Sequence, residues 1–88
     1  MTTPQPMTAD RIRAAFLAEL ATIAPDIDTD ALDPAVDLRE QADLDSMDFL
    51  NLTIALNQRL RIDIPESDTA ALTTIDGAVA FIARQLGG

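Results

Sequence analysis

The 88-residue sequence contains no histidine, lysine, cysteine, tryptophan or tyrosine. The chain therefore lacks the usual general base, Schiff-base amine, thiol nucleophile and soft metal ligands. A chain of this length folds as one domain and buries only about 60–65% of its unfolded surface, which leaves little room for an enclosed substrate cavity. We therefore expect no catalytic residues, and a function that depends on a surface, an attachment point or carboxylates.

Positive charge is also scarce. The sequence has six arginines and fifteen acidic residues, so the net charge is -9. Such a charge repels nucleic-acid backbones and anionic lipid headgroups, so neither is an expected partner. A partner with a basic docking patch is favoured instead, and its association should be fast and sensitive to salt.

The absence of cysteine excludes a disulfide scaffold and fits a reducing compartment. Residues 1–7 have neither the basic start nor the apolar core of a secretory signal, and the longest apolar run, residues 78–83, is far too short to span a bilayer. We predict a cytoplasmic, monomeric protein without membrane insertion.

The hydrophobic pattern predicts helices and no strands. Residues 1–7 are polar and proline-containing, so we expect a disordered leader followed by a domain over residues 8–88. Apolar residues recur at helical spacing from Ile12 to Ile23, with Thr8 as a cap and an end before Pro25. A second helix is expected from about Ser46 to Leu60.

The C-terminal third predicts a short helical turn over residues 67–72 and a last helix after it. Thr73 and Asp76 form a pair that resembles a capping box, and an apolar stripe follows through Ile75, Val79, Ile82 and Leu86. The predicted fold is all-α, a small four-helix bundle of three main helices and one short helix. A long loop, residues 25–45, joins helices one and two, and Leu32, Val36 and Leu38 could anchor it to the core.

The second helix has two apolar faces. Phe49, Leu52, Leu56 and Leu60 share one side, and Met47, Leu50 and Ile54 lie roughly 140° around the helix from them. The first set should face the core. The second is buried under the loop or against the short helix, or it is an exposed recognition stripe and the rim of a ligand pocket. The two interpretations are compatible if the stripe is only half covered.

Ser46 stands at the start of this helix between Asp45 and Met47. A serine in this position is ordinarily an N-cap, but Asp45 competes for that role. If Asp45 is the cap, Ser46 becomes the first helical residue, with a free hydroxyl beside the positive end of the helix dipole. Such a hydroxyl would tolerate an anionic phosphodiester, although its modification would need another enzyme because the chain supplies no base.

Asp45-Ser46-Met47 at a helix start, with Ile62-Asp63-Ile64-Pro65 and Leu72-Thr73-Thr74-Ile75 downstream, resembles the acyl carrier proteins over about residues 8–86. The resemblance implies that Ser46 carries 4'-phosphopantetheine, transferred from coenzyme A by a phosphopantetheinyl transferase. The thiol of this arm would hold acyl groups as thioesters for acyl-transferring or condensing enzymes of fatty-acid, polyketide or related lipid biosynthesis. The resemblance also implies a partner-recognition surface, made of Asp43, Asp45, Met47, Asp48, Leu50, Asn51 and Ile54.

The sequence departs from the fatty-acid-synthase members of this family in two respects. Positions of the second helix that are typically glutamate there include Asn51, Asn57, Gln58 and Arg59 here. The glycine common shortly before the aspartate-serine pair is also missing from the segment REQADLDS. These departures favour a specialised carrier with dedicated partners.

Three other functions fit parts of the sequence. Asp26, Asp28 and Asp30 reproduce the first ligand positions of an EF-hand calcium loop, but Ala31, Pro34 and Asp37 then replace its other key residues, so no metal site is predicted. A helical adaptor would use the Met47, Leu50 and Ile54 stripe with Ser46 unmodified. An aminoacyl or peptidyl carrier would use Ser46 in the same way with a different cargo.

Overall fold

The computed structural model describes residues 8–87, and the predicted disordered leader, residues 1–7, lies outside them together with Gly88. The described chain is helical throughout, as predicted, and has no strand within residues 8–87. Its elements are α1 (Ala9–Ile23), the 3-10 turn η1 (Thr29–Ala31), α2 (Leu38–Gln41), α3 (Ser46–Leu60), the 3-10 segment η2 (Glu66–Thr73) and α4 (Ile75–Gly87). The three long helices and the short η2 correspond to the four expected helices.

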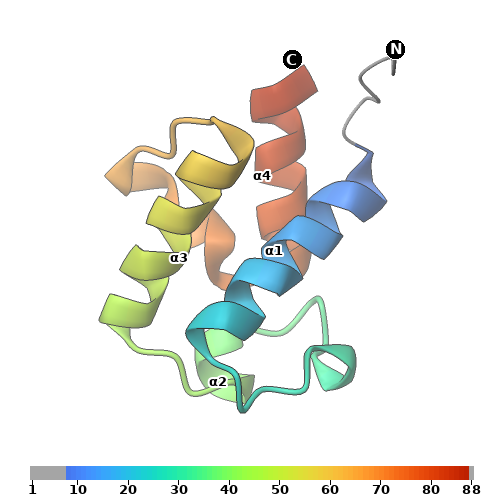
Figure 1. Ribbon diagram of the computed structural model, residues 1–88, viewed down its shortest axis with the longest axis vertical. Coiled ribbons are helices and arrows are strands. Elements are labelled where there is room, and N and C mark those ends of the chain that lie inside the picture. The colour runs from blue at the N-terminus through green and yellow to red at the C-terminus, as the bar shows by residue number, and fades with distance from the viewer. Residues whose placement is uncertain (1–7, 88) are drawn as a thin grey trace.

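Helix α1 lies against both α3 and α4, and the core fills the space between the three (Figure 1). The largest fully buried side chains come from every part of the fold: Ile12, Phe16, Leu20, Leu38, Leu52, Leu56, Leu72 and Ile82. Burying each stabilises the fold by about 1.5–3 kcal/mol before entropy is subtracted, so a few such residues hold this small bundle together.

The predicted apolar stripe of α4 is correct except at its last position. Ile75, Val79 and Ile82 are buried, whereas Leu86 remains 37% exposed. The last turn of α4 projects beyond the end of α3, so no neighbouring helix covers it (Figure 1).

The predicted cap of α4 is wrong by one residue. Thr73 still belongs to η2, where its hydroxyl donates to the carbonyl of Ala70 at 2.9 Å. Thr74 Oγ1 instead accepts from the Gly77 amide at 3.0 Å, at the start of the helix. Asp76, the other member of the predicted pair, accepts a hydrogen bond from Arg13 of α1 at 3.2 Å.

The segment between α1 and α3 is more ordered than the loop that we predicted. It contains α2, whose N-cap Asp37 accepts from the Arg39 amide at 2.8 Å and whose Leu38 is fully buried. The other two expected anchors, Leu32 and Val36, are half-buried.

Two sets of hydrogen bonds hold this segment in place. The Gln41 side-chain amide donates to the carbonyls of Asp33 and Val36, and its oxygen accepts from the Asp33 amide. The Asp76 amide at the start of α4 donates to the carbonyl of Pro34 at 3.0 Å. The second contact joins the loop to a long helix more than forty positions later in the chain.

A reciprocal capping box sets the start of α3. The Asp45 carboxylate accepts from the Asp48 amide at 2.9 Å, and the Asp48 carboxylate accepts from the Asp45 amide at 3.3 Å. Asp45 is therefore the N-cap and Ser46 the first helical residue, which is the second of the two alternatives left by the sequence.

Left-handed backbone conformations flank α3. Arg61, which ends the helix, has φ 54° and ψ 45°, and Asp43 before the capping box has φ 55°. Aspartate tolerates this region through its short polar side chain, whereas a longer side chain is less favourable there. A glycine before the aspartate-serine pair would supply the backbone conformation that Asp43 adopts.

The capping box predicts unequal effects for two neighbouring substitutions. Asp45→Ala should lower the free energy of unfolding by about 1 kcal/mol, because an N-cap is lost. Ser46→Ala should cost less than about 0.5 kcal/mol, because it removes no intramolecular hydrogen bond. Urea unfolding followed by circular dichroism measures both, and an equal cost at the two positions would contradict the assignment of Asp45 as the cap.

Relief of left-handed strain predicts that Arg61→Gly stabilises the protein by about 0.5–1 kcal/mol. The matched control is Arg84→Gly in α4, which places glycine in a helix and should lower stability by up to about 1 kcal/mol. Thermal unfolding of both variants gives the comparison. A destabilised Arg61→Gly variant would show that the arginine side chain matters more than its backbone conformation.

Candidate functional site

The Ser46 side chain is exposed at the start of α3, and its hydroxyl makes no hydrogen bond to any residue in the range 8–87. This freedom follows from the capping box, since Asp45 accepts the first-turn amide that a serine cap would take. The first-turn amides lie at the positive end of the helix dipole. Ser46 therefore combines an accessible hydroxyl with a local environment that offsets part of the surrounding negative charge.

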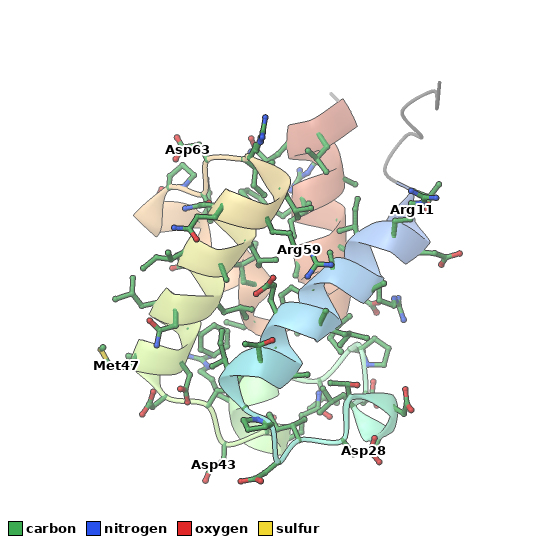
Figure 2. The ribbon with its side chains drawn as sticks, viewed as in Figure 1. Arg11, Asp28, Asp43, Met47, Arg59 and Asp63 are labelled. Atoms are coloured by element: carbon green, nitrogen blue, oxygen red, sulfur yellow. The ribbon has the colours of Figure 1, made fainter. Side chains whose placement is uncertain are left out.

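Three aspartates surround this serine in the chain. Asp43 and Asp45 are exposed, whereas Asp48 is half-buried and held by the capping box. Asp43 lies at the same end of the molecule as the start of α3 (Figure 2). Each of the three also has a structural role, Asp43 in the left-handed turn and the other two in the cap.

The second apolar face of α3 is about half exposed, so it is not fully buried under the loop, and the half-covered stripe in which both interpretations are compatible fits the structure. Met47, Leu50 and Ile54 are 62%, 52% and 45% exposed, and Met47 points away from the bundle (Figure 2). On the other face Leu52 and Leu56 are fully buried. We call Met47, Leu50 and Ile54 the exposed stripe, and Asn51 lies exposed on the same helix.

The charged and amide residues near the end of α3 are not all at the surface. Arg59 is exposed and bonded to Glu19 of α1 at 3.0 Å, which joins the two helices. Asn57 is half-buried, and its side-chain oxygen has no hydrogen-bond partner among residues 8–87. These positions therefore contribute no acidic surface to α3.

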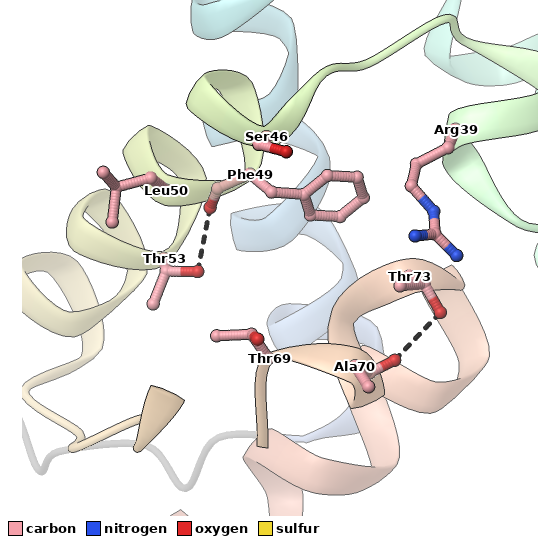
Figure 3. Close-up of a pocket in the computed structure, with 8 residues that line it drawn as sticks. All are labelled: Arg39, Ser46, Phe49, Leu50, Thr53, Thr69, Ala70 and Thr73. Atoms are coloured by element: carbon pink, nitrogen blue, oxygen red, sulfur yellow. Dashed lines mark hydrogen bonds between the residues drawn. The ribbon is translucent and has the colours of Figure 1, made fainter. Parts of the chain in front are cut away.

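A pocket of about 550 Å³ opens beside Ser46, between α3, η2 and α2 (Figure 3). Helix α3 contributes Ser46, Phe49, Leu50 and Thr53 to its lining. The facing wall is formed by Thr69, Ala70 and Thr73 of η2, with Arg39 of α2.

Apart from Ser46, the polar residues of this lining were not identified from the sequence. Thr53 was detectable in principle, because it is a hydroxyl residue one turn after Phe49 on a helix whose neighbouring positions are apolar. Arg39 was not detectable, because nothing in the local pattern indicates that α2 faces η2.

The Arg39 guanidinium is held by Asp37 of the same turn. Its Nε donates to Asp37 Oδ1 at 3.1 Å, and its Nη2 donates to Oδ2 at 2.7 Å. The side-chain hydrogen bonds from Arg39, followed by its backbone amide, lower the pKa of the Asp37 carboxyl. The carboxylate form is thereby favoured, and the pair fixes how the arginine is oriented at the pocket.

The aspartates of the EF-hand-like segment serve the local backbone. Asp28 caps η1 by accepting from the Asp30 amide at 3.1 Å, and Asp33 accepts from the Ala35 amide at 2.9 Å. In the part of the chain that the structure describes, no three acidic side chains come together as a group that could hold a metal ion. Across the same residues, no helix has the length and apolarity needed to cross a membrane.

Comparison with known proteins supplies the family. The family model described as "Phosphopantetheine attachment site" matches residues 10–82. An acyl carrier protein of Picosynechococcus is 34% identical over 62 residues, which cover 70% of this chain and 76% of that protein. One from Campylobacter jejuni strain RM1221 is 32% identical over 75 residues, or 85% of this chain and 91% of that protein.

A solved structure agrees with these relatives. The solution structure of a candidate acyl carrier protein from Anaplasma phagocytophilum matches with a TM-score of 0.77 and 25% identity, covering 92% of this chain and 94% of that one. The chain thus belongs to the phosphopantetheine attachment family and to its acyl carrier proteins, which are non-catalytic carriers of 4'-phosphopantetheine modified by a phosphopantetheinyl transferase.

Proposed function

We propose that Ser46 is the attachment residue for 4'-phosphopantetheine and that this protein carries acyl intermediates of fatty-acid, polyketide or related specialised lipid biosynthesis. The observation that carries the proposal is the exposed Ser46 hydroxyl, which is free of hydrogen bonds to the described residues because Asp45 caps the helix. The group would supply a terminal thiol on which acyl chains are held as thioesters.

The start of α3 fits an anionic phosphodiester. The helix dipole favours negative charge at this position, and the first-turn amides of Ser46 and Met47 have no hydrogen-bond partner among residues 8–87. Repulsion from Asp43, Asp45 and Asp48 opposes this attraction, but exposure to solvent screens it. The balance supports attachment at this serine without a dedicated cationic cradle.

The chain itself has no histidine or lysine to activate the serine, so the transferase must supply the base. The exposed stripe begins directly after Ser46 and extends over about two turns of the same helix. An apolar surface bordered by aspartates fits enzymes that present an apolar groove with a basic rim. We propose this surface, Asp43, Asp45, Met47, Asp48, Leu50, Asn51 and Ile54, as the docking site for the transferase and for acyl-transferring or condensing enzymes.

The distribution of charge along α3 supports dedicated partners. All the acidic side chains of this docking surface lie at or before the first turn, and Arg59 near the other end is bonded to Glu19. A partner whose basic residues bind along a long acidic helix would meet few acidic side chains on α3. We therefore propose a specialised carrier and not the housekeeping carrier of fatty-acid synthesis.

The attachment proposal predicts that a phosphopantetheinyl transferase and coenzyme A increase the protein mass by one phosphopantetheine group. Ser46→Ala should abolish the increase while the helical circular dichroism signal is retained. Ser67→Ala is the matched control, because Ser67 is the other serine of the chain and is also exposed. Intact-mass spectrometry reads the result, and a modified Ser46→Ala variant would exclude Ser46 as the attachment residue.

The docking proposal predicts that charge near Ser46 controls association with the transferase. Asp43→Asn with Asp45→Asn removes two charges and keeps both structures, because asparagine tolerates a left-handed backbone and caps helices well. The association rate should fall by roughly two- to fivefold at low salt and by less at high salt.

The matched control neutralises two caps of the loop, Asp28→Asn with Asp33→Asn, and leaves the docking surface intact. Stopped-flow measurements should show a smaller effect for this control. Equal effects of the two double variants would mean that net charge alone governs association.

A further inference from the structure

The wall of the pocket beside Ser46 is mostly apolar, but it also carries polar groups for which a plain hydrocarbon chain has no use. Arg39 and three threonines line it, together with Phe49, Leu50 and Ala70 (Figure 3). Burying a methylene group is favourable, but leaving one polar group without a partner offsets about two buried methylenes. An unsubstituted acyl chain in this pocket would gain apolar contacts, but it would remove water from the polar groups without giving them a hydrogen-bond partner.

The threonine hydroxyls that line the pocket act as acceptors. Thr53 Oγ1 donates its hydrogen to the carbonyl of Phe49 at 2.9 Å, and Thr73 Oγ1 donates to the carbonyl of Ala70 at 2.9 Å. A hydroxyl has only one hydrogen, so both oxygens are left with acceptor capacity alone. These walls therefore suit hydroxyl or amide hydrogens of a bound group.

Arg39 supplies the complementary donors. Its side chain extends from α2 toward the Phe49 ring, on the side of the pocket where Thr73 lies (Figure 3). Asp37 occupies the Nε and Nη2 edge of the guanidinium, whereas Nη1 makes no hydrogen bond to any residue in the range 8–87. The ion pair thus orients the group and leaves a second donor edge available.

Charge decides between an anionic and a neutral acceptor for this edge. The Asp37 carboxylate at 2.7 Å already balances the Arg39 charge, and the whole chain carries a net charge of -9. A second carboxylate would gain little from the paired arginine and would be repelled by the aspartates around it. A neutral carbonyl or hydroxyl oxygen gains a hydrogen bond to a charged donor without that repulsion.

Building on the proposed attachment at Ser46, we propose that this pocket selects acyl groups that carry a neutral oxygen, a ketone or a hydroxyl, on the chain. Arg39 is the specificity-determining residue, and the Thr53 and Thr73 hydroxyls accept from any hydroxyl or amide hydrogen that enters with the chain. The cargo class is an oxygenated acyl intermediate in place of a saturated fatty acyl chain. Enzymes that produce such groups by condensation or partial reduction are the matching suppliers.

Three acyl groups of equal length test this selection. A phosphopantetheinyl transferase can load the apo protein from hexanoyl-, 5-oxohexanoyl- and hexanedioyl-coenzyme A, which differ only at the end remote from the thioester. The readout is the rate at which an added small thiol, 2-mercaptoethanol, cleaves each thioester by thiol exchange, divided by the rate for the same acyl group on free pantetheine. Amide chemical shifts of Thr53, Thr69 and Thr73 report independently whether the chain enters the pocket.

The 5-oxohexanoyl thioester should be cleaved about two- to fivefold more slowly than the other two, the factor expected of one partly exposed hydrogen bond to an arginine. Arg39→Met, which keeps the length of the side chain and removes its donors, should abolish that difference. Arg84→Met, an exposed arginine of α4 outside the pocket lining, should leave it unchanged.

Each other outcome contradicts the inference in a distinct way. Slower cleavage of the hexanoyl form than of the 5-oxohexanoyl form would mean that the pocket favours hydrocarbon, and slowest cleavage of the hexanedioyl form would mean that it favours an anion. If Arg39→Met shifts the same amides in the form that carries the arm without cargo, and does not shift them in the apo form, the arginine contacts the arm instead. Failure to load any group contradicts attachment at Ser46 as well, whereas loading of all three with equal lifetimes contradicts this inference alone.

Discussion

The reciprocal hydrogen bonds between Asp45 and Asp48 fix where α3 begins, and the candidate site depends on that position. They place the helix start so that the Ser46 hydroxyl is free of hydrogen bonds to the described residues. The helix that follows turns Leu52 and Leu56 into the core and leaves the exposed stripe at the surface. The helix that begins at these two contacts thus has one face in the core and one at the surface.

The same chemistry recurs through the acidic loop. Several aspartate side chains accept a backbone amide two or three residues ahead: Asp28 from Asp30, Asp33 from Ala35, Asp37 from Arg39 and Asp45 from Asp48. Aspartate is well suited to this role because its short carboxylate reaches the nearby amides. Much of the negative charge therefore has a local structural cause, which also explains why a calcium-loop pattern arises here without a group of three ligands among residues 8–87.

The parts of the fold that the sequence predicted are those with a repeated physical signal. Apolar residues at helical spacing, such as Ile12, Phe16 and Leu20, identify α1 because each position reports the same buried face. A cap depends on one side chain, so Thr73 and Thr74 could not be distinguished before it was known that η2 extends through Thr73.

Short elements and contacts between distant segments were not predictable in the same way. Helix α2 has four residues, too few for any periodicity, and it is held by burial of Leu38 and the cap of Asp37. Only part of the candidate site could consequently be predicted from the sequence. Ser46 and the exposed stripe follow from one helix, whereas the pocket needs Arg39 and η2 to be brought to that helix by the tertiary fold.

The hydrogen bond from the Asp76 amide to the Pro34 carbonyl joins main chain to main chain. No side chain takes part in it, so substitutions at either position leave it intact unless residue 76 becomes proline. This anchor of the loop therefore does not depend on side-chain identity, unlike the contacts of Leu38 and Gln41. At exposed loop positions that make no such contact, a change of side chain can alter the charge of the surface while the main-chain anchor and the helices that it joins are retained.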